Sequence, residues 1–446
     1  MRTEARRRQP ATGLRPPRAR RRAAVLAGVV IVAVTFVGHD AASSSHAGGD
    51  SAWTTYQSLS LLEEGNLELS EWQDMLDRFP IHWYRNRRGE PVSTFPWGTA
   101  VMSAPIVGVL ALGDALSGRS LEENLRHTFA PPEVENTVAS TWVALTAGLL
   151  FALGWRELRS LPGAALLALT FAFATSAFST MSRALWAHGP AVFLVTVELL
   201  ILQAAALNRR AERLVPLLGP LFVLAYAVRP TMAVVAVVLG AVVAVRHRRQ
   251  LPAFAAAGVA AGLAYLAVNL STYGSLQPGY YDPHRLFGSS TFFEGLAGNL
   301  VSPQRGLLVW SPVLGFAAVG AVVSLRRGSF TLLQGAAVVA IVLHWLVIST
   351  LVPWYAGYST GPRLFSDVLP FFVFLMIPAL SELGGGGRAP ARWVGRGAFA
   401  VLLGWSVFTN TRGATRFETQ LWNATPVSVH DDESRLWDWG DLQFLR

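Results

Sequence analysis

Twelve apolar stretches separated by polar segments divide this chain along nearly its whole length. A helix needs about 20 apolar residues to cross a bilayer, and most of the stretches approach that length. The pattern therefore predicts an all-α polytopic membrane protein with about 11–12 transmembrane helices. The stretches lie near residues 23–38, 97–113, 136–153, 163–180, 189–207, 214–228, 231–245, 251–270, 306–325, 331–350, 364–381 and 397–411.

Composition supports the same class. Only 15% of the 446 residues are charged, whereas a soluble domain carries roughly a quarter. The chain has no Cys, which excludes a disulfide framework and a thiolate metal site. Its net charge of +9 comes entirely from Arg, since Lys does not occur. This charge is segregated between apolar stretches, so membrane topology explains it and nucleic acid is not an expected partner.

Arg clusters alternate with the apolar stretches in a way that predicts sidedness. Placing all of these clusters in the cytoplasm puts 22 Arg there against four acids, as the positive-inside rule requires. The N-terminus is then cytoplasmic, and nearly every other acid is external. The clusters are nine Arg in residues 1–22, Arg156 and Arg159, Arg209, Arg210 and Arg213, Arg246, Arg248 and Arg249, Arg326 and Arg327, and Arg388, Arg392 and Arg396.

One apolar stretch breaks this alternation. If 97–113 crossed fully, every later Arg cluster would face outward, so either this stretch is a re-entrant or half-inserted helix or a neighbouring boundary lies elsewhere. The expected organisation is a basic cytoplasmic tail (1–22), a transmembrane domain (23–411) and an external C-terminal tail (412–446). External loops at 39–96 and 271–305 carry short juxtamembrane helices.

The first external loop contains Asp50, for which two interpretations are open. Residues 51–63 have helical character, with Gly65 as a C-terminal stop. Asp50 could be the N-cap of that helix, because an Asp there accepts backbone N–H bonds of the first turn. Alternatively, it is a functional carboxylate at the external surface.

Further polar side chains flank the apolar stretches on the external side. Arg229 lies between two short stretches, where a charge is costly and should face a polar cavity or a partner. His188 and Arg305 precede stretches and suit either ligand binding or structural anchoring. Trp354 and Arg363 bound a segment rich in Tyr and Gly. Such a segment suits either a pocket that stacks a sugar and holds a phosphate or an ordinary aromatic belt.

Three motifs together resemble the GT-C glycosyltransferases, which are multi-span enzymes that use lipid-linked sugar donors. They are Asp50 followed by Tyr-x-x-x-Ser-Leu-Leu-Glu-Glu-Gly-Asn-Leu (56–67), Thr-Phe-Pro-Trp-Gly-Thr-Ala (94–100), and the segment Gly357 to Arg363. The family includes protein O-mannosyltransferases and bacterial envelope mannosyl- and arabinofuranosyltransferases. Its members commonly place one or two acidic residues early in the first external loop. Asp50 occupies that place, but its neighbour is Ser51 and not a second carboxylate.

The resemblance implies a GT-C-like fold in a bacterial plasma membrane with an external active site. It implies transfer of a sugar from a polyprenyl-phosphate donor to an envelope glycan, lipid or protein acceptor, with inversion. Asp50 is then the catalytic base, and Arg363, Arg305 and Arg229 are the residues for the phosphate. Tyr56, His188 and Trp354 are further substrate-binding residues. No cofactor or metal ligand is assigned, although a divalent cation stays open.

Two other functions use the same kinds of residue. A transporter or flippase of a lipid-linked glycan would also need Arg and Glu at membrane depth, and an internal inverted repeat would favour it. A surface-polysaccharide polymerase or ligase shares the substrates but usually needs a large external loop with Arg and His.

Overall fold

A computed structural model describes residues 18–280, 291–385 and 390–446, and helices dominate these ranges. The tail 1–17 and part of the 271–305 loop therefore lie outside the described residues. Within the described ranges, the single sheet is a two-stranded antiparallel ribbon of β1 (Trp83–Arg85) and β2 (Pro91–Ser93). Eight helices there are long and apolar enough to cross a membrane. The chain is an all-α polytopic membrane protein.

The eight helices are joined by three shorter apolar ones, of fewer than the roughly 20 residues that a full crossing needs. The long helices are α1 (Arg18–Asp40), α4 (Gly98–Leu116), α6 (Pro132–Leu158), α8 (His188–Leu207), η3 with α9 (Arg209–Leu217 and Leu218–Val228), η4 with α11 (Arg248–Gln250 and Leu251–Tyr273), α15 (Leu332–Ser349), and η7 with α16 (Arg363–Val368 and Leu369–Gly384). The shorter ones are α7 (Leu161–Phe173), α10 (Met232–Arg246), and η6 with α14 (Pro312–Gly315 and Phe316–Arg326).

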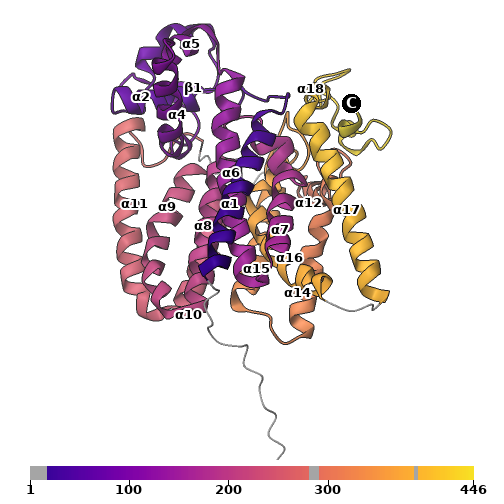
Figure 1. Ribbon diagram of the computed structural model, residues 1–446. Coiled ribbons are helices and arrows are strands. Elements are labelled where there is room, and N and C mark those ends of the chain that lie inside the picture. The colour runs from indigo at the N-terminus through magenta and orange to yellow at the C-terminus, as the bar shows by residue number, and fades with distance from the viewer. Residues whose placement is uncertain (1–17, 281–290, 386–389) are drawn as a thin grey trace, which may run out of the picture.

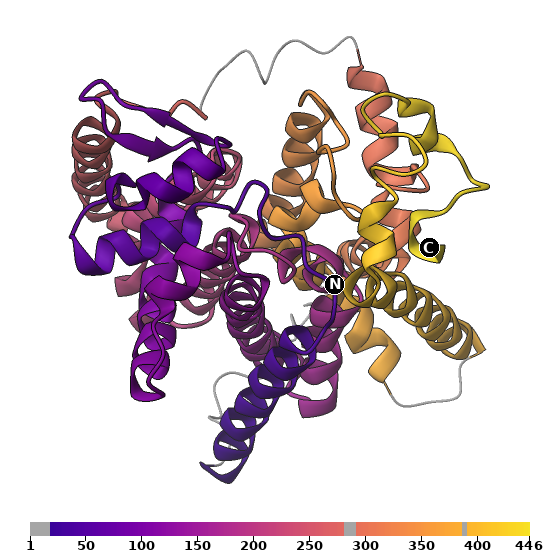
Figure 2. The same cartoon turned by 90° about the horizontal axis from the view of Figure 1, so that it is seen from above.

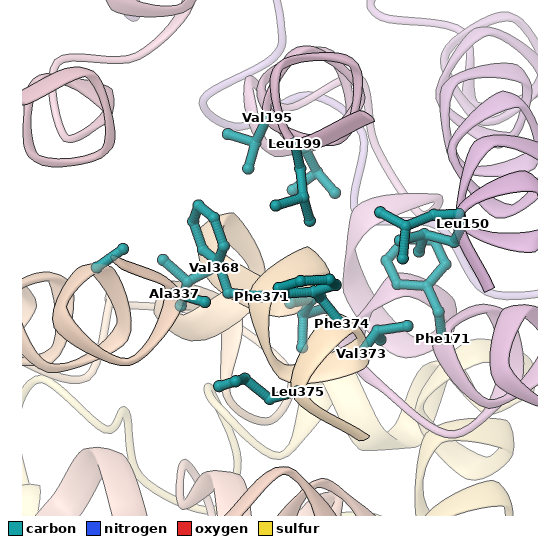
Figure 3. Packing of buried hydrophobic residues seen from close by; sticks show 14 of the residues in the cluster. Leu150, Phe171, Val195, Leu199, Ala337, Val368, Phe371, Val373, Phe374 and Leu375 are labelled. Carbon is teal, nitrogen blue, oxygen red and sulfur yellow. The ribbon is translucent and has the colours of Figure 1, made fainter. Parts of the chain in front are cut away.

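Most helices run side by side, and α16 lies at their centre (Figure 1). Its Phe371, Val373 and Phe374 are buried against residues of α6, α7, α8 and α15 (Figure 3). Within a bilayer the hydrophobic effect does not draw helices together, and small residues at their crossings allow close van der Waals packing instead. A Cβ on Gly320 of α14 would lie 1.9 Å from the carbonyl oxygen of Leu375 in α16, so only glycine fits this crossing. The helix α17 (Pro390–Thr415) packs on the outside of this core (Figure 1).

Short elements gather at one end of the bundle, which we call the loop end (upper end in Figure 1). The first loop contributes α2 (Thr54–Glu63), η1 (Ser70–Trp72), α3 (Gln73–Arg78) and the ribbon, and α5 (Leu121–His127) joins them. Buried aromatic rings of Trp53, Tyr56 and Trp72 hold this group together. The short helices predicted for the first loop are therefore present.

The helix α4 differs from the other long helices in its direction. It runs across the bundle at the loop end, seen end-on in Figure 1 and from the side in Figure 2. Gly98 lies against the last residues of α9, since a Cβ there would be 2.4 Å from the Ala227 carbonyl carbon. Further along, Ser103 accepts a hydrogen bond of 3.2 Å from Trp142 of α6. The length and hydropathy of α4 would allow a crossing, but its transverse direction favours the re-entrant or half-inserted arrangement predicted for 97–113.

The Arg-rich helix ends lie together at the opposite end, which we call the arginine end (Figure 1). The start of α1, the ends of α6, α8, α10 and α14, and the start of α17 all meet there. Clusters far apart in sequence thus share one side of the molecule. The positive-inside rule assigns that side to the cytoplasm and the loop end to the exterior.

Cysteine labelling tests this sidedness directly, because the native chain has no thiol background. Ser70→Cys and Thr425→Cys place exposed thiols at the loop end, and Ser329→Cys places one at the arginine end. With intact cells, an impermeant maleimide is expected to label the first two and to reach the third only after lysis. Labelling of Ser329→Cys in intact cells would reverse the assigned orientation.

Candidate functional site

A narrow cleft opens at the loop end and brings together six separate segments of the chain. It encloses about 400 Å³ when its open mouth is included, of which about 30 Å³ admits the centre of a water-sized molecule. Its polar lining is dominated by one carboxylate and two guanidinium groups. The lining residues are Asp50, Thr54, Phe95, Pro96, Thr99, Leu185, Trp186, Ala187, Val228, Arg229, Pro230, Tyr280 and Arg363.

Asp50 forms an ion pair with Arg363, which is 313 residues later in the chain. The Asp50 side chain is 41% exposed and that of Arg363 is 10% exposed, so the carboxylate faces the open side. The helix that follows begins at Thr54, and its N-cap is Trp53, without a side-chain cap bond. The interpretation of Asp50 as an N-cap is therefore wrong, since its carboxylate points to Arg363 and not to the first turn.

Two opposing effects act on the pKa of Asp50. Burial of the carboxyl would raise its pKa, but the positive charge of Arg363 and the hydrogen bond from it outweigh burial and lower the pKa below its usual value. Asp50 is therefore ionised over the whole physiological range. As a proton acceptor it is weak while Arg363 remains beside it, and it becomes stronger when that cation turns to another anion.

The guanidinium of Arg363 has three different neighbours. Besides Asp50, it donates from Nε to Nε2 of His188 at 3.3 Å. Its Cζ lies 3.9 Å from the centre of the Trp186 ring, a cation–π distance. These contacts fix the plane of the group, so that Arg363 presents its remaining N–H donors in a defined direction.

Asp367, one turn beyond Arg363, organises the buried side of the cleft. Its Oδ1 accepts from Nδ1 of His188 at 2.6 Å, and its Oδ2 accepts from Nε of Arg229 at 2.5 Å. Thr231 adds a hydroxyl at 3.0 Å to Oδ2. Asp367 is completely buried, and a buried carboxylate requires such partners. The Asp367 side chain therefore positions both Arg229 and His188, the histidine that contacts Arg363.

A neutral His188 satisfies both of its contacts. With the hydrogen on Nδ1 it donates to Asp367, and its Nε2 lone pair accepts from Arg363. This tautomer is assigned from the hydrogen-bond network. The groups form a continuous chain from Asp50 through Arg363, His188 and Asp367 to Arg229. Two carboxylates and two guanidinium groups balance in this chain, so an incoming anion competes with Asp50 for the charge of Arg363.

Four of the seven sequence-predicted site residues meet here: Asp50, Arg229, His188 and Arg363. Asp367 was missed, although the sequence carried a signal for it. It lies within the predicted apolar stretch 364–381, and an ionisable residue at membrane depth is a functional candidate by default.

Arg305 lies apart from the cleft, under the C-terminal segment. It is buried, and its donors go to protein acceptors that include Asn423, Gln443 and the backbone oxygen of Tyr355. The short helices α18 (Phe417–Leu421), η8 (Glu433–Trp437) and η9 (Gln443–Leu445) pack around it with α12 (Phe292–Val301) and α13 (Leu307–Trp310). Arg305 therefore fastens this segment to the bundle, and no donor remains for a phosphate.

Tyr56 and Trp354 also lie outside the cleft. The Tyr56 hydroxyl donates to the Leu125 carbonyl oxygen at 3.0 Å, inside the aromatic cluster of the first loop. Trp354 is buried against the glycines of α12, where a Cβ on Gly298 would be 2.3 Å from its ring. Both rings are packing elements. As to metals, the described ranges hold no group of three His, Asp or Glu side chains placed to bind an ion.

No protein-family model matches the chain, and no curated protein matches it either. The fold and the site together define a class: a multi-pass helical membrane protein with a charged cleft at one end of its bundle. The cleft combines an exposed carboxylate, an arginine that pairs with it, and a second arginine held from below by a buried aspartate.

Proposed function

We propose that this protein is a glycosyltransferase of the GT-C kind, acting at the loop end on a polyprenyl-phosphate sugar. One observation carries the proposal: a partly exposed carboxylate and two arginines share a single cleft at the loop end of the bundle. A lipid-linked phosphodiester is presented at that end, with its lipid among the helices. The acceptor is an envelope glycan, lipid or protein on the outer face of a bacterial plasma membrane.

The reaction needs one base and one cluster of donors for charge. The acceptor hydroxyl oxygen attacks C1 of the sugar while Asp50 takes its proton. The bond between C1 and the phosphate oxygen breaks, and the polyprenyl phosphate leaves with its bonding electrons. The negative charge that grows on this phosphate is matched by Arg363 and Arg229. Attack opposite the leaving group inverts the anomeric centre.

Arg363 has a double role in this scheme. In the free protein it pairs with Asp50, which keeps the carboxylate ionised. The donor phosphate competes for the same guanidinium and draws it away from Asp50. The pKa of Asp50 then rises, so the base strengthens when the donor is in place. The narrowness of the free cleft is consistent with this, because the ion pair fills the space that the phosphate would take.

Variants at Arg363 test the role of the guanidinium. Arg363→Lys keeps the charge but loses the planar fork, so we expect reduced transfer. Arg363→Gln should lose roughly a hundredfold or more, the usual effect of removing one such donor. Initial rates with a short-chain polyprenyl-phosphate sugar measure both. Arg88→Gln is the matched control, since Arg88 is 55% exposed, pairs with Glu68 at the same end and does not line the cleft.

The pH profile of Arg363→Gln gives a further expected result. Without the cation of Arg363, burial is opposed only by the smaller effects of His82 and Arg229, so the pKa of Asp50 rises. As the pH is lowered, the variant should therefore lose kcat/KM at a higher pH than the native protein does. An unchanged acid limb, together with native rates in both variants, would leave Arg363 as a structural residue only.

Transfer in detergent solution separates the proposal from its alternatives. A detergent micelle does not separate two compartments, so transport or flipping across it cannot occur. A glycosyltransferase still forms a covalent product there. Purified protein, donor and extracts of envelope acceptors are incubated, and products are read by mass spectrometry. The expected product gains one sugar, with release of polyprenyl phosphate. A ladder of longer products would indicate a polymerase, and no product with any acceptor fraction would contradict the proposal.

A further inference from the structure

A second cleft lies at the arginine end, far from the site described above. It is formed where α8 ends, where η3 begins and where α10 passes into η4. The volume open to the centre of a water-sized molecule is about 500 Å³ in this cleft and about 30 Å³ in the cleft at the loop end. Ligand pockets usually have volumes of about 300–1,000 Å³. Its polar lining includes Arg209, Glu212, Arg246, His247, Arg248 and Arg249.

The charge of this second cleft is strongly one-sided. Four arginines line it, and Glu212 is its single acidic residue. Among the described residues, none of the four guanidinium groups forms an ion pair or a side-chain hydrogen bond with the protein. His247, in the middle of the group, is 95% buried, and its Nδ1 has no hydrogen-bond partner. The nearest carboxylate oxygen, on Glu212, is 4.0 Å away. The guanidinium donors of the cleft thus have no acceptor within the described part of the protein.

An apolar strip leads away from the cleft along α10. Val245 at the rim is 58% exposed, and Val237, two turns earlier on the same face, is 71% exposed. Ala241 lies between them at helical spacing and is also exposed. Leu207 at the end of α8 adds a second exposed apolar side chain to the rim. The unpaired guanidinium groups therefore adjoin an apolar path that points into the bilayer.

We infer that this cleft binds the phosphate headgroup of an anionic phospholipid, with an acyl chain along Val245 and Val237. Guanidinium groups suit phosphate oxygens because their N–H donors match them in pairs. A free phosphate would use the same arginines but not the apolar strip, and this favours the lipid. Basic pockets between membrane helices are a known setting for such headgroups. The site is independent of the proposed transferase cleft.

Two matched double variants test the site in the full-length protein in detergent. Arg246→Gln with Arg248→Gln removes two charges from the cleft. Arg210→Gln with Arg213→Gln removes two charges from the same end of the bundle but from residues that do not line it. Native mass spectrometry with phosphatidylglycerol should show affinity at least about tenfold weaker in the first variant and within about twofold of native in the second. Phosphatidylcholine, which has no net charge, should bind the native protein much more weakly than phosphatidylglycerol.

Other results would overturn the inference. Equal weakening in both double variants would mean diffuse charge attraction, and equal binding of the two lipids would mean apolar contact alone. Inorganic phosphate that displaces phosphatidylglycerol at similar concentration would make this a small-anion site. Should the cleft variant fail to fold, photocrosslinking of a headgroup-labelled phosphatidylglycerol to the native protein decides. Crosslinks are expected at residues 205–212 and 245–250, and crosslinks spread over other arginine clusters would refute the site.

Discussion

Asp50→Asn is expected to lower sugar transfer by roughly a hundredfold or more, the usual scale for losing a positioned base. The amide keeps the size of the side chain but cannot take a proton from the acceptor. Stability should change little, because the carboxylate is 41% exposed and an ion pair of this kind contributes about 0–1 kcal/mol. Initial rates and thermal melting in detergent measure the two effects separately.

Glu64→Gln serves as the control for Asp50→Asn. Glu64 is an exposed carboxylate that follows α2 in the same loop and does not line the cleft. The control should transfer sugar at the native rate. Native activity in Asp50→Asn would instead reduce Asp50 to a structural partner of Arg363, and another base would have to be sought.

Asp367→Asn is expected to destabilise the protein by about 3–5 kcal/mol, because it leaves the charge of Arg229 buried without its counter-ion. His188 would also lose its acceptor or be forced to share it, so the support of Arg363 weakens. Melting temperature in detergent measures the first effect. Transfer by the folded fraction measures the second, and a loss of more than about tenfold is expected for one displaced charge-assisted contact.

A double variant distinguishes a buried ion pair from a general packing defect. Arg229→Gln combined with Asp367→Asn removes both charges, so it should be more stable than Asp367→Asn alone. Asp114→Asn is the matched control, since it breaks an Asp–Arg pair in which Arg119 is 71% exposed. That change should stay within about 0.5 kcal/mol. A native melting curve for Asp367→Asn would contradict the counter-ion role.

The class of fold could be predicted from sequence because hydropathy is a local property. Each apolar stretch predicts a helix from its own residues alone, and the positions of the Arg clusters predict which side of the membrane each helix end faces. In the described ranges, eight helices are long and apolar enough to cross a membrane and three apolar helices are shorter. The count of 11–12 crossings therefore stays a prediction. The unusual direction of α4 was detectable only as a conflict between 97–113 and the Arg clusters on either side.

The site was only partly predictable, for a different physical reason. Arg229 was a candidate because a charge beside hydrocarbon needs a partner, and Arg363 because it ends a segment rich in Tyr and Gly. The partner itself can be any distance away, and Asp367 lies 138 residues from Arg229. Arg305 was expected either to bind the phosphate or to anchor the chain, and its charge is held by neutral oxygens of the C-terminal segment. Residue type alone does not tell whether a buried arginine pairs with a carboxylate, as Arg229 does, or bonds to neutral oxygens, as Arg305 does.

The long separation between Asp50 and Arg363 sets an order for biosynthesis. At about 5–20 residues per second, the 313 residues between them take roughly 15–60 s to synthesise. During that time the first loop is already outside the ribosome and its carboxylate has no cation. The loop before Arg363 is in turn fastened by Gln443, which accepts from the backbone N–H of Gly361 at 3.2 Å. A nascent chain stalled between these points would hold an unpaired aspartate at the membrane surface, a feature by which quality control could tell it from the finished protein.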